Sequence, residues 1–246
     1  MRVAEFETLF VALVFAAVYG RAGRLSHVRL TFPERWLSVA AGVSVAYVFV
    51  ELLPELELRS QDLLKMAGGD LLYAEKHIYI YALVGFAFFY GLDAFLLRSR
   101  VFQRLRGPEG TPDAAFWVHV GGYAPYSWVL GYLLIDRAAA GEYALAFYAI
   151  AMALHLTVLG TGLERDHGRA YERFGWWVLA ASVLVGWLVS VTVRAPEDVI
   201  HRLFAFVAGG VMLTSMNAEL PHPHEGQFWW FLVGSVAFAV LLLLAV

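Results

Sequence analysis

Apolar residues run through this sequence in long blocks that are separated by short polar stretches. The length of these blocks suits the roughly 20 residues that a helix needs to cross the hydrocarbon core of a bilayer. Transmembrane β-strands would instead show about ten residues of alternating pattern, which the blocks lack. The sequence therefore predicts eight α-helical spans, at Phe6–Gly20, Trp36–Leu53, Ile78–Leu97, Ala115–Ile135, Tyr143–Leu163, Phe174–Val193, Val199–Leu220 and Phe228–Val246.

The composition agrees with this pattern. Hydrophobic residues make up 60% of the 246 residues and charged residues only 16%, against about 25% charged residues in soluble domains. A net charge of -3 without basic blocks gives no reason to expect a nucleic-acid partner. Because the chain has no cysteine, disulfides, thiolate metal sites and cysteine nucleophiles are excluded. These features predict an integral membrane protein.

The basic residues predict its orientation. The loops after the first, third and fifth spans hold 11 of the 18 basic residues, and loops rich in basic residues stay in the cytoplasm. Both termini are therefore expected outside. The first apolar block follows MRVAEFE, which is net negative, so it is interpreted as a retained span rather than a secretory signal. The counted residues are Arg21, Arg24, Arg29, Arg35, Arg98, Arg100, Arg104, Arg106, Arg165, Arg169 and Arg173.

The predicted loops are short, so residues 1–246 are expected to form a single polytopic membrane domain. The longest loop, about Pro54–His77, contains a short amphipathic stretch, LELRSQDLLKMAGG. A short single-domain chain of this kind is typical of a prokaryotic inner (plasma) membrane, which is the predicted location.

An internal repeat relates the second and seventh spans. Gly42–Glu55 reads GVSVAYVFVELLPE and Gly210–Glu225 reads GVMLTSMNAELPHPHE, so in both a Gly-Val pair precedes Glu-Leu by the same spacing. The spans that follow also match, LVGFAFF (Leu83–Phe89) against LVGSVAF (Leu232–Phe238). In the predicted topology the two copies run in opposite directions. Inverted repeats of this type build transporter sites near the middle of the membrane.

These residues resemble the ZIP (Zrt/Irt-like) family of divalent metal transporters. The resemblance rests on Leu53-Pro54-Glu55 at the end of the second span, on ALVGFAFFYGLDAFL (Ala82–Leu96), and on the last two spans. It implies an eight-span bundle with both termini outside, in which spans 1–3 and 6–8 surround spans 4–5. It also implies transport of a divalent cation such as Zn²⁺, as substrate rather than as a required cofactor.

The fourth and fifth spans depart from the family pattern. His119 matches the family's histidine in the fourth span, but Val120 replaces an asparagine and Tyr123 stands where an acidic residue belongs. His155 matches in the fifth span, where HLTVLGTGLE offers no carboxylate before Glu164. The paired-metal centre that the family implies is thus reduced to two candidate histidines.

His119 and His155 lie well inside predicted spans, where a polar ring is costly unless it faces a partner or a cavity. One interpretation has them face each other and bind or relay a cation, since imidazole is the commonest metal ligand. The other has each of them hydrogen-bonded within the bundle. Further oxygen atoms for a cation pathway would come from Tyr123, Ser127 and Thr157.

Two acidic candidates and one turn extend this pathway. Glu51 and Glu219 are repeat partners, and they are either acidic stations at its two mouths or simple helix-end groups. The turn Pro221-His222-Pro223-His224-Glu225 offers His222, His224 and Glu225 as metal ligands at the inner mouth, or it is an ordinary proline-rich connection.

Three functions remain open from the sequence. The first is a ZIP-like carrier of Zn²⁺ or another divalent cation, and the second is a non-transporting scaffold or sensor with the same fold. The third is an intramembrane zinc hydrolase with His119, His155 and His201 as ligands and Asp93 as acid or base. Since no HExxH pattern is present, an enzyme is not expected, and an ion pair with Arg98 is the favoured role of Asp93. The expected partners are the lipid bilayer and a divalent cation, with a homodimer left open.

Overall fold

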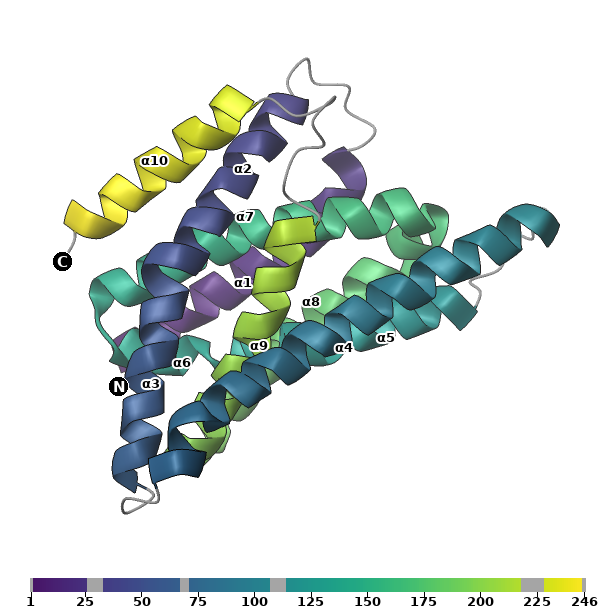
Figure 1. The fold of residues 1–246 in the computed structure, drawn as a ribbon. Coiled ribbons are helices and arrows are strands. Elements are labelled where there is room, and N and C mark those ends of the chain that lie inside the picture. Colours follow the sequence, from purple (N-terminus) through teal and green to yellow (C-terminus); the bar gives the residue numbers. More distant parts are fainter. Residues whose placement is uncertain (1, 26–32, 67–70, 107–113, 218–227, 245–246) are drawn as a thin grey trace.

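The computed structural model describes residues 2–25, 33–66, 71–106, 114–217 and 228–244. These ranges consist of helices joined by short non-helical connections and contain no strand (Figure 1). The helices are α1 (Arg2–Leu25), α2 (Pro33–Tyr47), η1 (Val48–Leu52), α3 (Leu53–Met66), α4 (Leu71–Arg106), α5 (Ala114–Tyr132), α6 (Leu134–Ala139), α7 (Glu142–His167), η2 (Tyr171–Gly175), α8 (Trp176–Thr192), α9 (Glu197–Asn217) and α10 (Phe228–Leu244).

Within the described residues, five helical segments are long and apolar enough to cross a membrane. They are Ser38–Lys65, Lys76–Phe95, Tyr143–His167, Tyr171–Thr192 and Glu197–Met216, and α10 is a shorter apolar helix. Large apolar side chains cover the outside of the bundle, such as Leu244 with 82% of its surface exposed and Trp229 with 73%. An apolar exterior of this extent suits lipid rather than water. The predicted all-helical membrane class is thus confirmed.

The predicted second span does not end at Leu53. The helix continues from η1 into α3 as far as Met66, so most of the predicted loop after Pro54 is helical. Proline has no N–H to donate and normally breaks a helix. Here the turn before it widens into a π-helix, Val48–Leu52, in which the N–H of Leu53 bonds to the carbonyl of Val48. The π-turn contains one residue more than an α-helical turn. This additional residue accommodates Pro54, so the helix continues past the proline.

The fourth and fifth predicted spans are joined by a tight reversal. Helix α5 ends at Tyr132, the short helix α6 follows, and Gly141 then adopts a φ of 134°. That backbone conformation is accessible to glycine and strained for other residues. After the reversal, α7 runs to His167, four residues past the predicted end at Leu163, and it thereby brings His167 into the bundle.

Three pairs of helices approach so closely that main chain meets main chain: α2 with α10, α4 with α9, and α5 with α8. In the first pair, a methyl group at Gly42 would overlap the carbonyl oxygen of Phe231, and one at Gly234 would overlap that of Val39. Figure 1 shows α10 lying beside α2 at the edge of the molecule. Small residues are what allow helices to pack this closely within a membrane.

The other two pairs follow the same rule. Between α4 and α9, Gly209 lies against the carbonyl of Ala82 and Gly85 against that of Phe206. Between α5 and α8 the corresponding contacts are Gly131 with Val183 and Gly186 with Trp128. In every case a glycine abuts the carbonyl three residues before the partner glycine. We call these contacts the glycine crossings.

Candidate functional site

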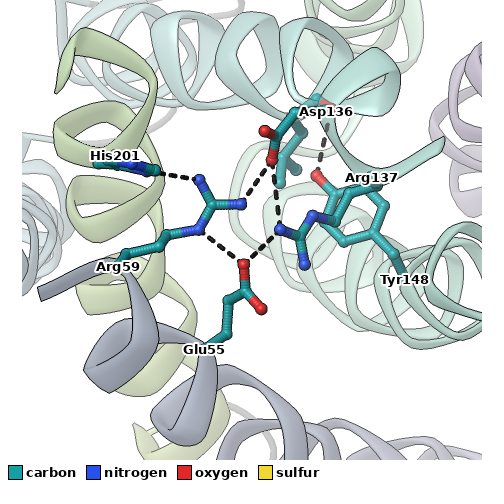
Figure 2. A network of polar contacts seen from close by, with 7 residues as sticks. Glu55, Arg59, Asp136, Arg137, Tyr148 and His201 are labelled. Carbon is teal, nitrogen blue, oxygen red and sulfur yellow. Dashed lines mark hydrogen bonds and ion pairs between the residues drawn. The ribbon is translucent and has the colours of Figure 1, made fainter. Parts of the chain in front are cut away.

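Charged side chains meet where α3, α6 and α9 come together (Figure 2). Arg59 is at the centre. Its Nε donates to Glu55 Oε1 at 2.8 Å, its Nη2 donates to Asp136 Oδ2 at 2.6 Å, and its Nη1 lies 3.0 Å from His201 Nδ1. Arg137 Nη2 donates to the same Glu55 oxygen at 2.6 Å and lies 3.2 Å from Asp136 Oδ2. We call these five residues the arginine network.

The arginine network is largely removed from solvent. Arg137 is 2% exposed and Arg59 is 5% exposed, and both guanidinium groups lie over the ring of Phe204. Since two cations face two carboxylates, the buried charges balance. Burial alone would lower the pKa of Arg137, but Glu55, Tyr47 and Asp136 together outweigh it, so the pKa is raised above its ordinary value. Removing one partner of this network would leave a buried charge without its counterion.

The contact between Arg59 and His201 fixes the histidine's tautomer. A guanidinium group only donates hydrogen bonds, so Nδ1 of His201 must be the acceptor and carries no proton. A cavity of about 440 Å³ lies beside the arginine network. Its lining residues are Asp62, Lys65, Asp136, Glu197, Ile200 and His201. Asp136 and His201 of the arginine network thus line a polar cavity.

A second group of polar side chains lies deep in the bundle. His155 on α7 has no exposed surface; its Nε2 is 2.9 Å from the hydroxyl of Tyr126 and 3.4 Å from that of Thr214. Ser127 lies 2.8 Å from the hydroxyl of Tyr19 and donates to the carbonyl of Tyr123 at 2.9 Å. Buried polar groups of this kind are tolerated because their hydrogen bonds are satisfied inside the protein.

A third group lies where the N-terminal part of α5 meets the C-terminal end of α7. His119 Nδ1 is 2.9 Å from His167 Nε2, and His119 Nε2 is 3.7 Å from Asp93 Oδ1 on α4. The ring of Tyr123 packs on the ring of His119 with their centroids 5.3 Å apart. We call Asp93, His119, Tyr123 and His167 the histidine cluster.

The residues proposed from the sequence are distributed over these groups. His119 and His155 have different partners, and the contacts do not bring them face to face. The three histidines of the hydrolase hypothesis are likewise separated, because His201 contacts Arg59. Thr157 donates to the carbonyl of Ala153 within its own helix at 2.7 Å. Half-buried Glu51 lies in the π-turn, one turn before Glu55.

Other proposed residues cannot be located. Glu219, His222, His224 and Glu225 lie outside the described residues, as does the side chain of Arg98 that was expected to pair with Asp93. In the described ranges, no group of three or more His, Asp or Glu side chains could hold a metal ion. In the histidine cluster, Asp93 and His167 lie against different nitrogens of His119, so these three side chains do not converge on one point.

The sequence interpretation missed the residues that complete these groups. His167 belongs to the charged stretch ERDHGRAYER, which reads as a solvated turn. Arg59 and Arg137 were counted only as charges outside the spans. One signal was present: in LPELELR and LIDRAA, acidic and basic residues directly follow an apolar block, and paired charges are expected where such ends are buried.

Comparison of the chain with protein-family models finds no match, and comparison with curated proteins finds no significant similarity.

Proposed function

We propose that this protein is a membrane carrier of a divalent cation, Zn²⁺ or a similar ion, built as a ZIP-like bundle of eight spans. In this proposal both termini lie outside the cytoplasm, and the halves made by spans 1–3 and 6–8 are inverted copies that surround spans 4 and 5. The arginine network then lies at the outer end of the bundle and the histidine cluster at the cytoplasmic end.

The glycine crossings are the observation that carries the proposal. If the two halves are copies, then α2 corresponds to α9 and α4 to α10, and the α2–α10 contact must recur between α9 and α4. It does so residue for residue, because Gly42 and Gly209 are equivalent and Gly85 and Gly234 are equivalent. The carbonyls that they meet also correspond, Phe231 with Ala82 and Val39 with Phe206.

The remaining helix contacts agree with two copied halves. If the halves are copies, α1 corresponds to α8 and α5 to α7. The α5–α8 pair should then have a counterpart in α1–α7, and these two helices do pack together. The sequence repeat paired Gly42 with Gly210, one position away from the structural match. The doublet Gly209-Gly210 explains this, since either glycine satisfies the sequence pattern. Repeats of this type allow a carrier to open alternately to each side.

A line of polar side chains supports transport through spans 4 and 5. His119, Tyr123 and Ser127 are spaced by four residues, so they share one face of α5. Tyr126 and its partner His155 lie alongside, and the arginine network stands about 27 Å from His119 along the chain of α5 and α6. Ionisable groups inside a membrane protein commonly mark such pathways.

The choice of a divalent cation rests on ligand chemistry. The line offers imidazole nitrogens and phenol and alcohol oxygens, a donor set that first-row divalent metals accept. The family resemblance points to the same substrate class. In the proposed resting arrangement the arginine network closes the outer end, and a cation in the cavity beside it would meet the carboxylates of Asp62, Asp136 and Glu197.

Flux measured in proteoliposomes tests this proposal. The purified chain is reconstituted with a metal-sensitive dye inside, and Zn²⁺, Mn²⁺ or Co²⁺ is added outside. We expect saturable uptake that is at least tenfold above protein-free liposomes. Substitution of His155 by alanine should reduce it, whereas the exposed control Arg169→Ala should not. If the folded protein carries none of these ions, the scaffold or sensor alternative replaces the carrier.

A further inference from the structure

One buried nitrogen in the histidine cluster has no hydrogen-bond partner. It is Nε2 of His119, whose residue is only 4% exposed. Oδ1 of Asp93 lies 3.7 Å from this nitrogen, which is too far for a hydrogen bond. A buried imidazole nitrogen that faces a carboxylate without contacting it leaves a site for a positively charged species between the two atoms.

The other nitrogen of the ring is already engaged. His119 Nδ1 and His167 Nε2 are 2.9 Å apart, so one of them carries the proton that joins them. When His119 is the donor, its Nε2 presents a lone pair toward Asp93. Hydrogen bonding of the remote nitrogen is the usual way in which proteins orient a histidine that ligates a metal.

We propose that a divalent cation binds between His119 Nε2 and Asp93 Oδ1, with the hydroxyl of Tyr123 beside it. This inference rests on the proposed carrier function and assigns its cytoplasmic-side ligands. Asp93 supplies the negative charge that two histidines alone would lack. Tyr123 is buried and interacts with Asp93, so the carboxylate is held on the same side of the cluster as His119.

The separation of the two atoms accommodates a metal ion. Metal–nitrogen and metal–oxygen bonds of about 2.1 Å to atoms 3.7 Å apart enclose an angle of about 124° at the ion, which is normal for low-coordinate metals.

The small number of protein ligands fits a transported ion. Two firm ligands and a neighbouring phenol leave the remaining coordination positions to water, so binding is strong enough to capture the ion and weak enough to release it. The presence of imidazole favours zinc-like ions over Mg²⁺ or Ca²⁺, which prefer all-oxygen sites.

Cobalt binding to the full-length protein in detergent tests the site, because the visible absorption of Co²⁺ reports its ligands. All variants carry His222→Ala and His224→Ala, so that the Pro-His-Pro-His segment does not contribute. In this background we expect Asp93→Asn and His119→Gln each to weaken Co²⁺ binding at least tenfold. His167→Gln, which removes the orienting contact, should weaken it about 10–100-fold and leave the shape of the absorption bands unchanged.

Two matched controls accompany these variants. Asp198 is an aspartate of similar exposure, 37% against 34% for Asp93, and His77 is a half-buried histidine on α4 outside the cluster. Asp198→Asn and His77→Gln should change the affinity less than twofold. The thermal melt of each variant reports folding, and if His119→Gln does not fold, the partly exposed Asp93 provides the deciding variant.

The outcomes separate this inference from the carrier proposal. Absence of Co²⁺ binding in the background protein, or binding that Asp93→Asn and His119→Gln leave unchanged, overturns the site. Flux that is insensitive to these two substitutions also overturns it and leaves the carrier standing. Binding that depends on both residues, in a protein without flux, retains the site and removes the carrier.

Discussion

The glycine crossing between α4 and α9 can be tested by adding a single methyl group. In Gly209→Ala the new Cβ would overlap the carbonyl oxygen of Ala82 and approach the amide nitrogen of Phe86. Both are main-chain atoms, so no side chain can rotate away and the two helices must separate. Gly162→Ala on α7 is the matched control, because Gly162 is exposed and no atom lies within 4 Å of the added methyl group.

The two substitutions should change the free energy of unfolding in opposite directions. Overpacking of a close contact costs about 1–3 kcal/mol, whereas alanine in place of glycine in a helix returns up to about 1 kcal/mol. Gly209→Ala should therefore lose about 1–2 kcal/mol of the free energy of unfolding, and Gly162→Ala should gain up to about 1 kcal/mol. For a chain of this length, 1 kcal/mol shifts Tm by about 2–4 °C, so Gly209→Ala should melt about 2–8 °C lower than the parent.

Thermal unfolding in detergent, followed by tryptophan fluorescence and helical circular dichroism, measures both variants. The proposed equivalence of the two halves adds a further expectation, that Gly42→Ala is destabilised by a similar amount through its contact with Phe231. If Gly209→Ala melts no lower than Gly162→Ala, the main chains of α4 and α9 do not meet as described. If only one of Gly42→Ala and Gly209→Ala is destabilised, the equivalence of the two crossings is wrong.

Three further predictions concern the polar groups and the topology. Arg137→Met removes the 2.6 Å partner of Glu55 and should lower the free energy of unfolding by about 3 kcal/mol, measured by a thermal melt. Lys65→Met, at an exposed ion pair, should lower it by less than about 1 kcal/mol. Equal losses in the two variants would contradict the burial of Arg137. Tyr126→Phe leaves His155 without its 2.9 Å hydrogen bond and should lower the free energy of unfolding by about 1–2 kcal/mol. Tyr143→Phe, at an exposed position, should leave it unchanged. An unchanged stability of Tyr126→Phe would exclude the contact with His155. Because the chain has no cysteine, an impermeant maleimide on intact cells should label Glu197→Cys but reach Arg169→Cys only after the membrane is opened, and the reverse result would invert the proposed orientation.

The helices themselves could be predicted because lipid imposes a simple requirement. Long apolar blocks must become helices, and the structure places a helix at each of the eight predicted blocks. The course of the chain after Pro54 could not be predicted. Proline normally indicates a helix end, and the sequence VFVEL contains no signal for the π-turn that accommodates Pro54.

The candidate site was predictable only in part. The cost of a histidine in an apolar block identified His119 and His155, but a sequence does not reveal which nitrogen faces which neighbour. His167 was missed because α7 extends beyond the apolar block and carries a charged segment into the bundle. The arginine network was missed for a related reason, since Arg59, Asp136 and His201 come from three helices whose meeting depends on tertiary packing.

The π-turn at Val48–Leu52 sets the direction of the side chains in the C-terminal part of this helix through the number of residues rather than through their identity. Each helical residue advances the direction of the side chains by about 100°, so one surplus residue turns everything after it by that amount. Glu55 and Arg59 reach Arg137 and Asp136 with the surplus residue in place. Deleting Phe49 or Val50 would point both side chains elsewhere while altering none of the charged groups. A sequence comparison by substitution alone would overlook such a change, although it would dismantle the whole ionic assembly.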